Sequence, residues 1–214
     1  MELHRTDEER LESLKNWWSE HGRALIGGVV LGLLGIGGWT FWQDYDRGQA
    51  EAASVLFQAV SEAAAAGDHT AVREAGSALL ADHSGRGYAA AASLLLARSE
   101  ILEGRPDGAM AHLKWAVDHA EIPEIRRIAR VRLAEATWAA GAPDKALALL
   151  DETPAGPFRA ASDELTGDIH FAGREPEKAR AAWERAAEGY SDSPASRQRV
   201  TLKLNDLGHL NTPP

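Results

Sequence analysis

The chain has 214 residues, of which 32 are Asp or Glu and 23 are Lys or Arg, so its formal net charge at pH 7 is −9. An acidic chain without clustered basic residues is a poor partner for nucleic acid, because phosphate binding needs concentrated positive charge. The absence of cysteine excludes disulfides, thiolate catalysis and zinc-cysteine sites.

The N-terminal segment has the pattern of an amphipathic helix. Thr6 and Glu9 have the spacing of a capping box, which predicts a helix start. Leu11, Leu14 and Trp18 then fall on one face of that helix. We therefore expect an interfacial helix at the membrane surface, leading into the apolar segment that follows.

Residues 24–42 form an apolar run without a charged side chain. At a rise of about 1.5 Å per residue, a helix of this run is about 28 Å long, close to the ~30 Å hydrocarbon core of a bilayer. The run is longer than the apolar region of a signal peptide and lacks the polar face of a core helix. It ends in Trp39, Phe41 and Trp42, which are typical of the membrane–water interface. We predict a transmembrane helix over 24–43 in contact with membrane lipid.

The flanks of the span predict its orientation. The positive-inside rule counts Lys and Arg, and the first flank carries more of them despite its acidic net charge. Only Arg47 follows within twenty residues of the span, whereas the preceding side holds Arg5, Arg10, Lys15 and Arg23. The sequence therefore predicts a cytoplasmic tail over 1–23 and an exported C-terminal domain.

Three glycines share one face of the predicted span. Gly28, Gly32 and Gly35 have the spacing i, i+4 and i+7, which would let another helix approach closely. The alternative is ordinary glycine enrichment, because glycine is common in transmembrane helices. The sequence leaves both interpretations open.

After a short polar neck at 44–48, the chain from residue 49 to 214 reads as helices separated by Gly, Pro and Asp. Glycines at the predicted turns recur at intervals of 37, 37 and 32 residues, at Gly67, Gly104, Gly141 and Gly173. This recurrence is typical of stacked helical hairpins. The segment after the span has about 165 residues, which suffice for one domain with a substantial core.

Small and large residues also recur in the second helix of each hairpin. Ala109 and Leu113 match Ala146 and Leu150 in the next repeat, and alanine lets paired helices approach closely while the larger residue fills the gap. Ala179, Trp183 and Ala186 continue the pattern, although chance periodicity in alanine-rich helices is the alternative. We predict an all-α chain, with one transmembrane helix followed by an α-solenoid like that of tetratricopeptide repeats. The hairpin around Gly67 matches poorly and is expected to be a degenerate cap, and the helix over 194–207 is expected to cap the other end.

First helices of such solenoids line a groove that binds peptide segments. Aligning the repeats places two columns of residues on this face. The apolar column contains Ile101, Trp138 and Phe171. The charged column beside it contains Arg98, Glu135 and Asp168. The alternative, which we favour for the two aromatic residues, is that they belong to the core between repeats.

The sequence contains little that indicates catalysis. His112 and His119 lie two turns apart on one helix without a plausible third ligand. Established nucleophile, zinc-protease and phosphate-loop motifs do not occur. We therefore expect neither an enzyme nor a bound metal or cofactor.

The N-terminal stretch carries a family resemblance. Residues 11–25, read LESLKNWWSEHGRAL, run directly into a glycine-rich span that ends GWTFW, and both resemble the YfgM family of bacterial inner-membrane proteins. The hairpin over 173–187 and the tail LKLNDL over 202–207 are also similar, so that the resemblance covers nearly the whole chain.

This resemblance implies an ancillary subunit of the SecYEG protein-export translocon, with its repeats in the periplasm. It further implies work beside the membrane-anchored chaperone PpiD and contact with polypeptides that emerge from the channel. The architecture alone also suits an envelope scaffold or signalling adaptor, and the sequence does not separate the two.

Overall fold

A computed structural model describes residues 7–210 of this protein except 86, 154–155 and 157. The described residues form helices joined by turns and contain no strand, which confirms the all-α prediction. The chain divides into two compact units, Met1–Glu51 and Ala52–Pro214.

The first unit consists of the N-terminal part of α1, the helix Asp7–Ala66. Thr6 of the expected capping box lies outside the described residues. Residues 44–48, expected as a polar neck, continue the helix without a break. This stretch contains no proline, and an ion pair of 3.8 Å between Arg47 and Asp44 at i, i+3 supports the helical conformation.

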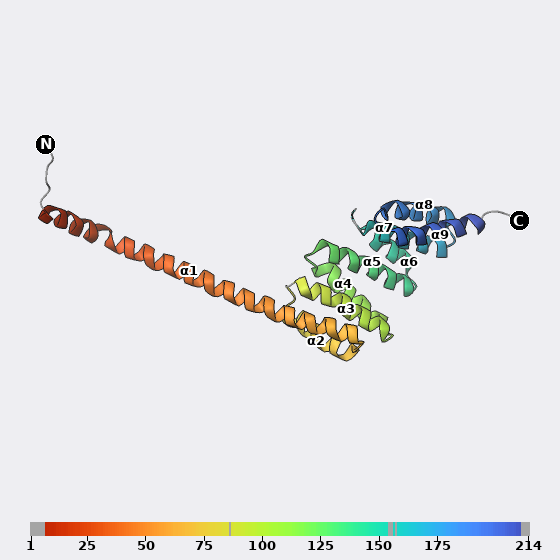
Figure 1. The fold of residues 1–214 in the computed structure, drawn as a ribbon, viewed down its shortest axis with the longest axis horizontal. Helices are drawn as coiled ribbons and strands as arrows, with labels where there is room; N and C mark the ends of the chain where they lie inside the picture. Colours follow the sequence, from red (N-terminus) through yellow and green to blue (C-terminus); the bar gives the residue numbers. More distant parts are fainter. Residues whose placement is uncertain (1–6, 86, 154–155, 157, 211–214) are drawn as a thin grey trace, which may run out of the picture. The chain divides into compact units, whose positions relative to one another are not determined.

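The second unit begins with the last turns of α1 and continues through helices that pack in sequence order as antiparallel hairpins (Figure 1). These helices are α2 (His69–Asp82), α3 (Gly87–Leu102), α4 (Pro106–His119), α5 (Pro123–Ala139), α6 (Pro143–Asp151), α7 (Arg159–Ala172), α8 (Pro176–Gly189) and α9 (Pro194–Leu210). Several of them begin with proline, whose fixed φ suits the first helical position and whose missing N–H is not needed there.

The turns within the hairpins share one hydrogen-bond pattern. The residue after each turn donates its backbone N–H to the carbonyl five positions earlier, as in a Schellman motif, with N···O distances of 2.9, 2.8, 3.1 and 2.9 Å for Asp68, Arg105, Ala142 and Glu175. Such a turn needs one residue with positive φ, and the φ values are 74° at Gly67, 74° at Gly104 and 83° at Gly141. In the last hairpin the expected glycine is not that residue: Gly173 has a φ of −74°, and Arg174 takes the left-handed conformation with a φ of 60°.

The repeating alanines lie in the core, as the sequence predicts. Ala109, Ala146 and Ala179 are fully buried where the second helix of each hairpin meets the first. The larger residue four positions later is also buried at Leu113 and Trp183. Close helix packing through small side chains therefore builds the second unit.

Both ends of the second unit are closed by helices. Val60 of α1 packs with Val72 and Leu96 in one core cluster, so the poorly matching first hairpin does form. At the other end Val200 and Leu207 of α9 are buried in a cluster that includes Trp183 and α8 alanines. The expected C-terminal cap is thus present.

Candidate functional site: an anchor face and a groove

The apolar part of α1 is exposed at every residue whose burial the structure describes. An 18-residue window of it has a mean hydropathy of 1.7 and no buried residue, which fits a single membrane span by length and composition. A Cβ atom added at Gly28, Gly32 or Gly35 would meet nothing within 4 Å. The glycine face is therefore open to lipid or to another helix, and its role in helix contact stays a prediction.

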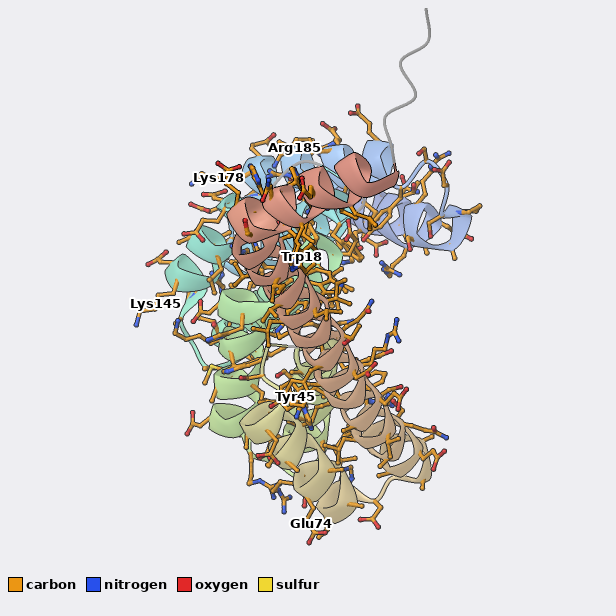
Figure 2. All side chains as sticks on the ribbon, turned by 90° about the vertical axis from the view of Figure 1, so that its left-hand side faces the viewer. Trp18, Tyr45, Glu74, Lys145, Lys178 and Arg185 are labelled. Carbon is orange, nitrogen blue, oxygen red and sulfur yellow. The ribbon has the colours of Figure 1, made fainter. Side chains whose placement is uncertain are left out.

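Aromatic and apolar side chains flank the span on both sides. Trp39 and Trp42 have ring centroids 5.6 Å apart at one end. Before the span, Leu11, Leu14 and Trp18 are all more than half exposed on the N-terminal turns of α1. Figure 2 shows Trp18 and Tyr45 projecting from this helix. These side chains have the amphipathic character of residues at a membrane interface.

The predicted charged column lies along a series of adjoining hollows on the first helices. A hollow of about 480 Å³ lies between the end of α1 and α3, and Arg98 lines it. Arg98 also lines the next hollow, of about 540 Å³, where Glu135 of α5 joins it. Glu135 extends into a third hollow of about 280 Å³, which Asp168 of α7 lines as well. The structure therefore brings the whole charged column onto one groove.

The predicted apolar column does not stay together. Ile101 is 50% exposed and lines the middle hollow. Trp138 instead packs half-buried against the cluster that holds Val131, and the Phe171 ring lies 5.5 Å from the Trp183 ring. Trp138 thus contributes to the core, the alternative that we favoured from the sequence. Phe171 does not, because it is 43% exposed and touches Trp183 only at the edge of its own hairpin.

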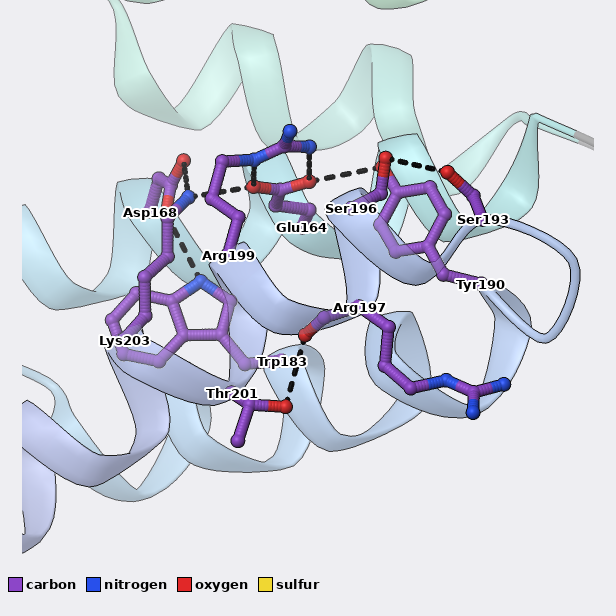
Figure 3. Close-up of polar contacts among 10 residues, drawn as sticks. All are labelled: Glu164, Asp168, Trp183, Tyr190, Ser193, Ser196, Arg197, Arg199, Thr201 and Lys203. Carbon is purple, nitrogen blue, oxygen red and sulfur yellow. Dashed lines mark hydrogen bonds and ion pairs between the residues drawn. The ribbon is translucent and has the colours of Figure 1, made fainter.

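A dense polar network closes the α9 end of the groove (Figure 3). Arg199 donates to both oxygens of Glu164, with Nε–Oε1 and Nη2–Oε2 distances of 2.8 and 2.7 Å. Lys203 donates to Glu164 at 2.8 Å and to both oxygens of Asp168 at 2.7 and 2.8 Å. Tyr190 completes the shell of Glu164 through its hydroxyl at 2.9 Å. Because these bonds join α7 to α8 and α9, they hold the C-terminal cap in place.

The same network shifts two protonation equilibria. Burial opposes ionisation of Glu164, but the bonds from Arg199, Lys203 and Tyr190 outweigh it and lower the pKa of Glu164 to about 2. Burial, together with the bond to ionised Glu164, raises the pKa of Tyr190 to about 12. Glu164 is therefore a permanent anion at physiological pH.

A second buried carboxylate lies at the turn between α3 and α4. Glu100 is only 6% exposed and accepts hydrogen bonds from Arg105 at 2.6 and 3.1 Å and from Arg73 at 3.4 Å. These bonds, above all that of Arg105, lower the pKa of Glu100 although burial opposes the shift. The carboxylate is fully engaged with helices α2 to α4 and serves packing rather than binding.

Sequence reasoning missed Glu164 and its partners. A usable signal was present, because Glu164 and Arg199 are opposite charges 35 positions apart, as are Asp168 and Lys203. In a solenoid, residues one repeat length apart lie side by side on adjacent first helices. Opposite charges at the repeat interval therefore predict ion pairs between repeats.

The hollows of the groove are lined mainly by apolar side chains, with charged residues at their edges. Among the described residues, no group of three or more His, Asp or Glu side chains could hold a metal ion. His119 stacks on Trp115 with ring centroids 4.6 Å apart, and burial lowers the pKa of His112. The groove thus offers apolar hollows with charges at their edges, which suits an extended polypeptide.

Comparisons with known proteins cover almost the whole chain. The family model described as a tetratricopeptide repeat-like domain matches residues 15–209. Curated relatives named ancillary SecYEG translocon subunit are 27% identical over 97% of this chain and 99% of the protein in Escherichia coli, and 28% identical over 94% and 97% in Haemophilus influenzae. The relative of that name in Neisseria gonorrhoeae is 28% identical over 97% of this chain and its full length.

Solved structures with a similar fold come from a different kind of protein. A crystal structure of nearly identical TPR-like repeats from a putative kinesin light chain of Podosopora anserina has a TM-score of 0.53 and 22% identity. The match covers 77% of this chain and 85% of that one. At this identity the likeness supports the repeat fold alone.

Proposed function

This chain belongs to the tetratricopeptide repeat-like domain family, and we propose that it is a non-enzymatic ancillary subunit of the SecYEG protein-export translocon. The observation that carries the proposal is similarity along almost the entire chain, anchor and repeats together, to relatives bearing that name. Similarity to the repeats alone would fit many adaptors. These relatives also confirm the YfgM resemblance seen in the sequence.

In this proposal the span anchors the chain in the bacterial inner membrane, with the tail over 1–23 in the cytoplasm and the repeats in the periplasm. The repeats there bind a membrane-anchored chaperone of the PpiD kind and assist polypeptides that leave the channel. The Lys and Arg excess before the span supports the orientation. The groove along the first helices supports the binding role.

Purification after mild solubilisation tests the proposal. The full chain carries a C-terminal affinity tag, the membrane is dissolved in a mild detergent, and co-purifying proteins are identified by mass spectrometry. We expect the translocon subunits and a periplasmic chaperone to be enriched over a tagged, unrelated single-span protein. Recovery of cell-wall or outer-membrane assembly factors without any translocon component would overturn the proposal in favour of an envelope scaffold.

A matched pair of span variants tests where the translocon is contacted. Leucine at Gly32 would obstruct the glycine face, whereas leucine at Gly37 lies on the opposite side of the same helix; neither added Cβ meets an atom within 4 Å. We expect Gly32→Leu to reduce recovery of the translocon and Gly37→Leu to leave it unchanged. Equal recovery with both variants would show that the glycine face is not the contact.

A further inference from the structure

Arg98 lies where two hollows of the groove meet and has no charged partner in the described part of the chain. Its side chain is exposed, and it lines both the α1–α3 hollow and the α3–α5 hollow. The nearby acidic residues are engaged elsewhere: Glu135 accepts a bond of 2.7 Å from Arg132, and Glu100 is held by Arg105 and Arg73. Arg98 makes no ion pair within the described part of the chain.

The surroundings of Arg98 are apolar. The α1–α3 hollow is lined by Phe57, alanines and leucines together with Ser61, and Arg98 is its charged residue. In the α3–α5 hollow, Ile101 is 50% and Leu102 62% exposed. Apolar side chains exposed together beside a cation mark a surface that gains from being covered.

The net charge of the α3–α5 hollow indicates which kind of partner it can bind. The α3–α5 hollow has two arginines and one glutamate in its lining, so one positive charge remains there in a chain whose formal net charge is −9. At the other end of the groove, Arg199 and Lys203 of α9 already neutralise the acidic residues. The part of the groove whose charge is not neutralised is therefore the section along α1, α3 and α5.

We propose that this section binds an extended polypeptide segment in which apolar side chains flank a carboxylate, with the carboxylate paired to Arg98. Alternate side chains of an extended chain point the same way, about 6.6 Å apart, so two apolar residues around one Asp or Glu enter the adjoining hollows. The inference rests on the proposed function and deepens it, because it states which clients or partner segments the repeats select.

Fluorescence anisotropy with two probe peptides tests the inference. The probes are fluorescein-labelled unstructured peptides of Leu and Ser with one central residue, Asp in the first and Lys in the second. The protein is the full chain in detergent micelles. We expect the Asp probe to bind about three-fold more tightly than the Lys probe, which is the range of a partly exposed ion pair.

Charge reversal at Arg98 gives the sharpest comparison. Arg98→Glu should invert the preference between the two probes, and because Arg98 makes no ion pair the far-UV circular dichroism and urea midpoint should not change. Lys145→Glu is the matched control, since Lys145 projects outward from α6 (Figure 2) and lines none of the groove hollows, and it should leave the preference intact. Ile101→Ser should weaken both probes alike.

Several outcomes would overturn the inference. They are equal affinity of the wild-type chain for both probes, failure of the Asp probe to bind, and the same change in Lys145→Glu as in Arg98→Glu. A concentration-dependent dimer in sedimentation that Arg98→Glu abolishes would assign the section to a second copy of the chain instead. If the inference fails while the wild-type chain still co-purifies with the translocon, the proposed function stands.

Discussion

Gly167 is the point of closest approach between the helices of the last hairpin, and a single methyl group there should loosen it. A Cβ atom at Gly167 would lie 2.3 Å from Cδ1 and 2.4 Å from Nε1 of Trp183. Carbon atoms in contact lie about 3.5–4.0 Å apart, so the ring or the helix must move by more than 1 Å. Gly167→Ala should therefore destabilise the second unit.

The ring of Trp183 has little freedom to move aside. It is 3% exposed, and its Nε1 donates to Asp168 at 3.0 Å. Overpacking costs about 1–3 kcal/mol, and loss of a hydrogen bond to a carboxylate adds about 1.5–3 kcal/mol if the ring turns away. Alanine regains about 1 kcal/mol through its helix propensity. The free energy of unfolding should fall by about 1.5–5 kcal/mol if the ring turns away and loses its hydrogen bond, and by up to about 2 kcal/mol if the bond is kept.

Urea denaturation of the full chain in detergent, followed by far-UV circular dichroism, measures this change. Gly87→Ala is the matched control in the same unit, because its added Cβ would lie an ordinary 3.6 Å from Ile122. We expect a lower midpoint for Gly167→Ala and an unchanged or slightly higher midpoint for Gly87→Ala. The cost of Gly167→Ala should also shrink when Trp183 is replaced by Leu, which removes the clash. Equal midpoints for the two glycine variants would refute the reasoning.

Three further predictions follow from the ion network, the turns and the anchor. Because the folded-state pKa of Glu164 is lowered to about 2, its ionised side chain stabilises the fold fully above the ordinary pKa, and this stabilisation is lost as pH falls. The unfolding midpoint should therefore drop between about pH 5 and 2, and it should drop less in Glu164→Gln. At pH 7 this variant should be about 1–3 kcal/mol less stable than the wild-type chain. Arg174 has a φ of 60°, which strains any residue other than glycine, so Arg174→Gly should raise the free energy of unfolding by about 0.5–1 kcal/mol. Gly104 has a φ of 74°, so Gly104→Ala should lower it by about 1 kcal/mol. Urea titrations measure both changes. In the cysteine-free chain, a membrane-impermeant maleimide added to spheroplasts should label Glu184→Cys but not Glu12→Cys, and the reverse labelling would contradict the proposed orientation.

Local patterns made much of the fold predictable from the sequence. The apolar run of the span depends on composition alone, and the turn glycines at Gly67, Gly104 and Gly141 do adopt the left-handed conformation. At Gly173 the pattern misleads, because the glycine is present one position before the residue that turns. A neighbouring residue can substitute when the hairpin packing of α7 and α8 compensates for its strain.

The groove was predictable only in part. The charged column Arg98, Glu135 and Asp168 lies on one groove because its members have equivalent positions in successive repeats. The apolar column separates, since Trp138 packs against the core of its neighbouring helices, whereas Ile101 and Phe171 stay 50% and 43% exposed. Helical periodicity specifies a face, whereas side-chain size and the local helix spacing determine whether that face is covered.

The sequence by itself therefore determined the anchor, the helical hairpins and the face that carries the groove, because each depends on residues close together along the chain or on a fixed repeat. Only the tertiary structure decided which charges remain available. Glu164 and Asp168 are neutralised by Arg199 and Lys203 from another helix, whereas Arg98 has no charged partner among the residues that the structure describes. Ion pairing between helices depends on distances that packing sets, and the same packing leaves the single cation on which the proposed selectivity of the groove rests.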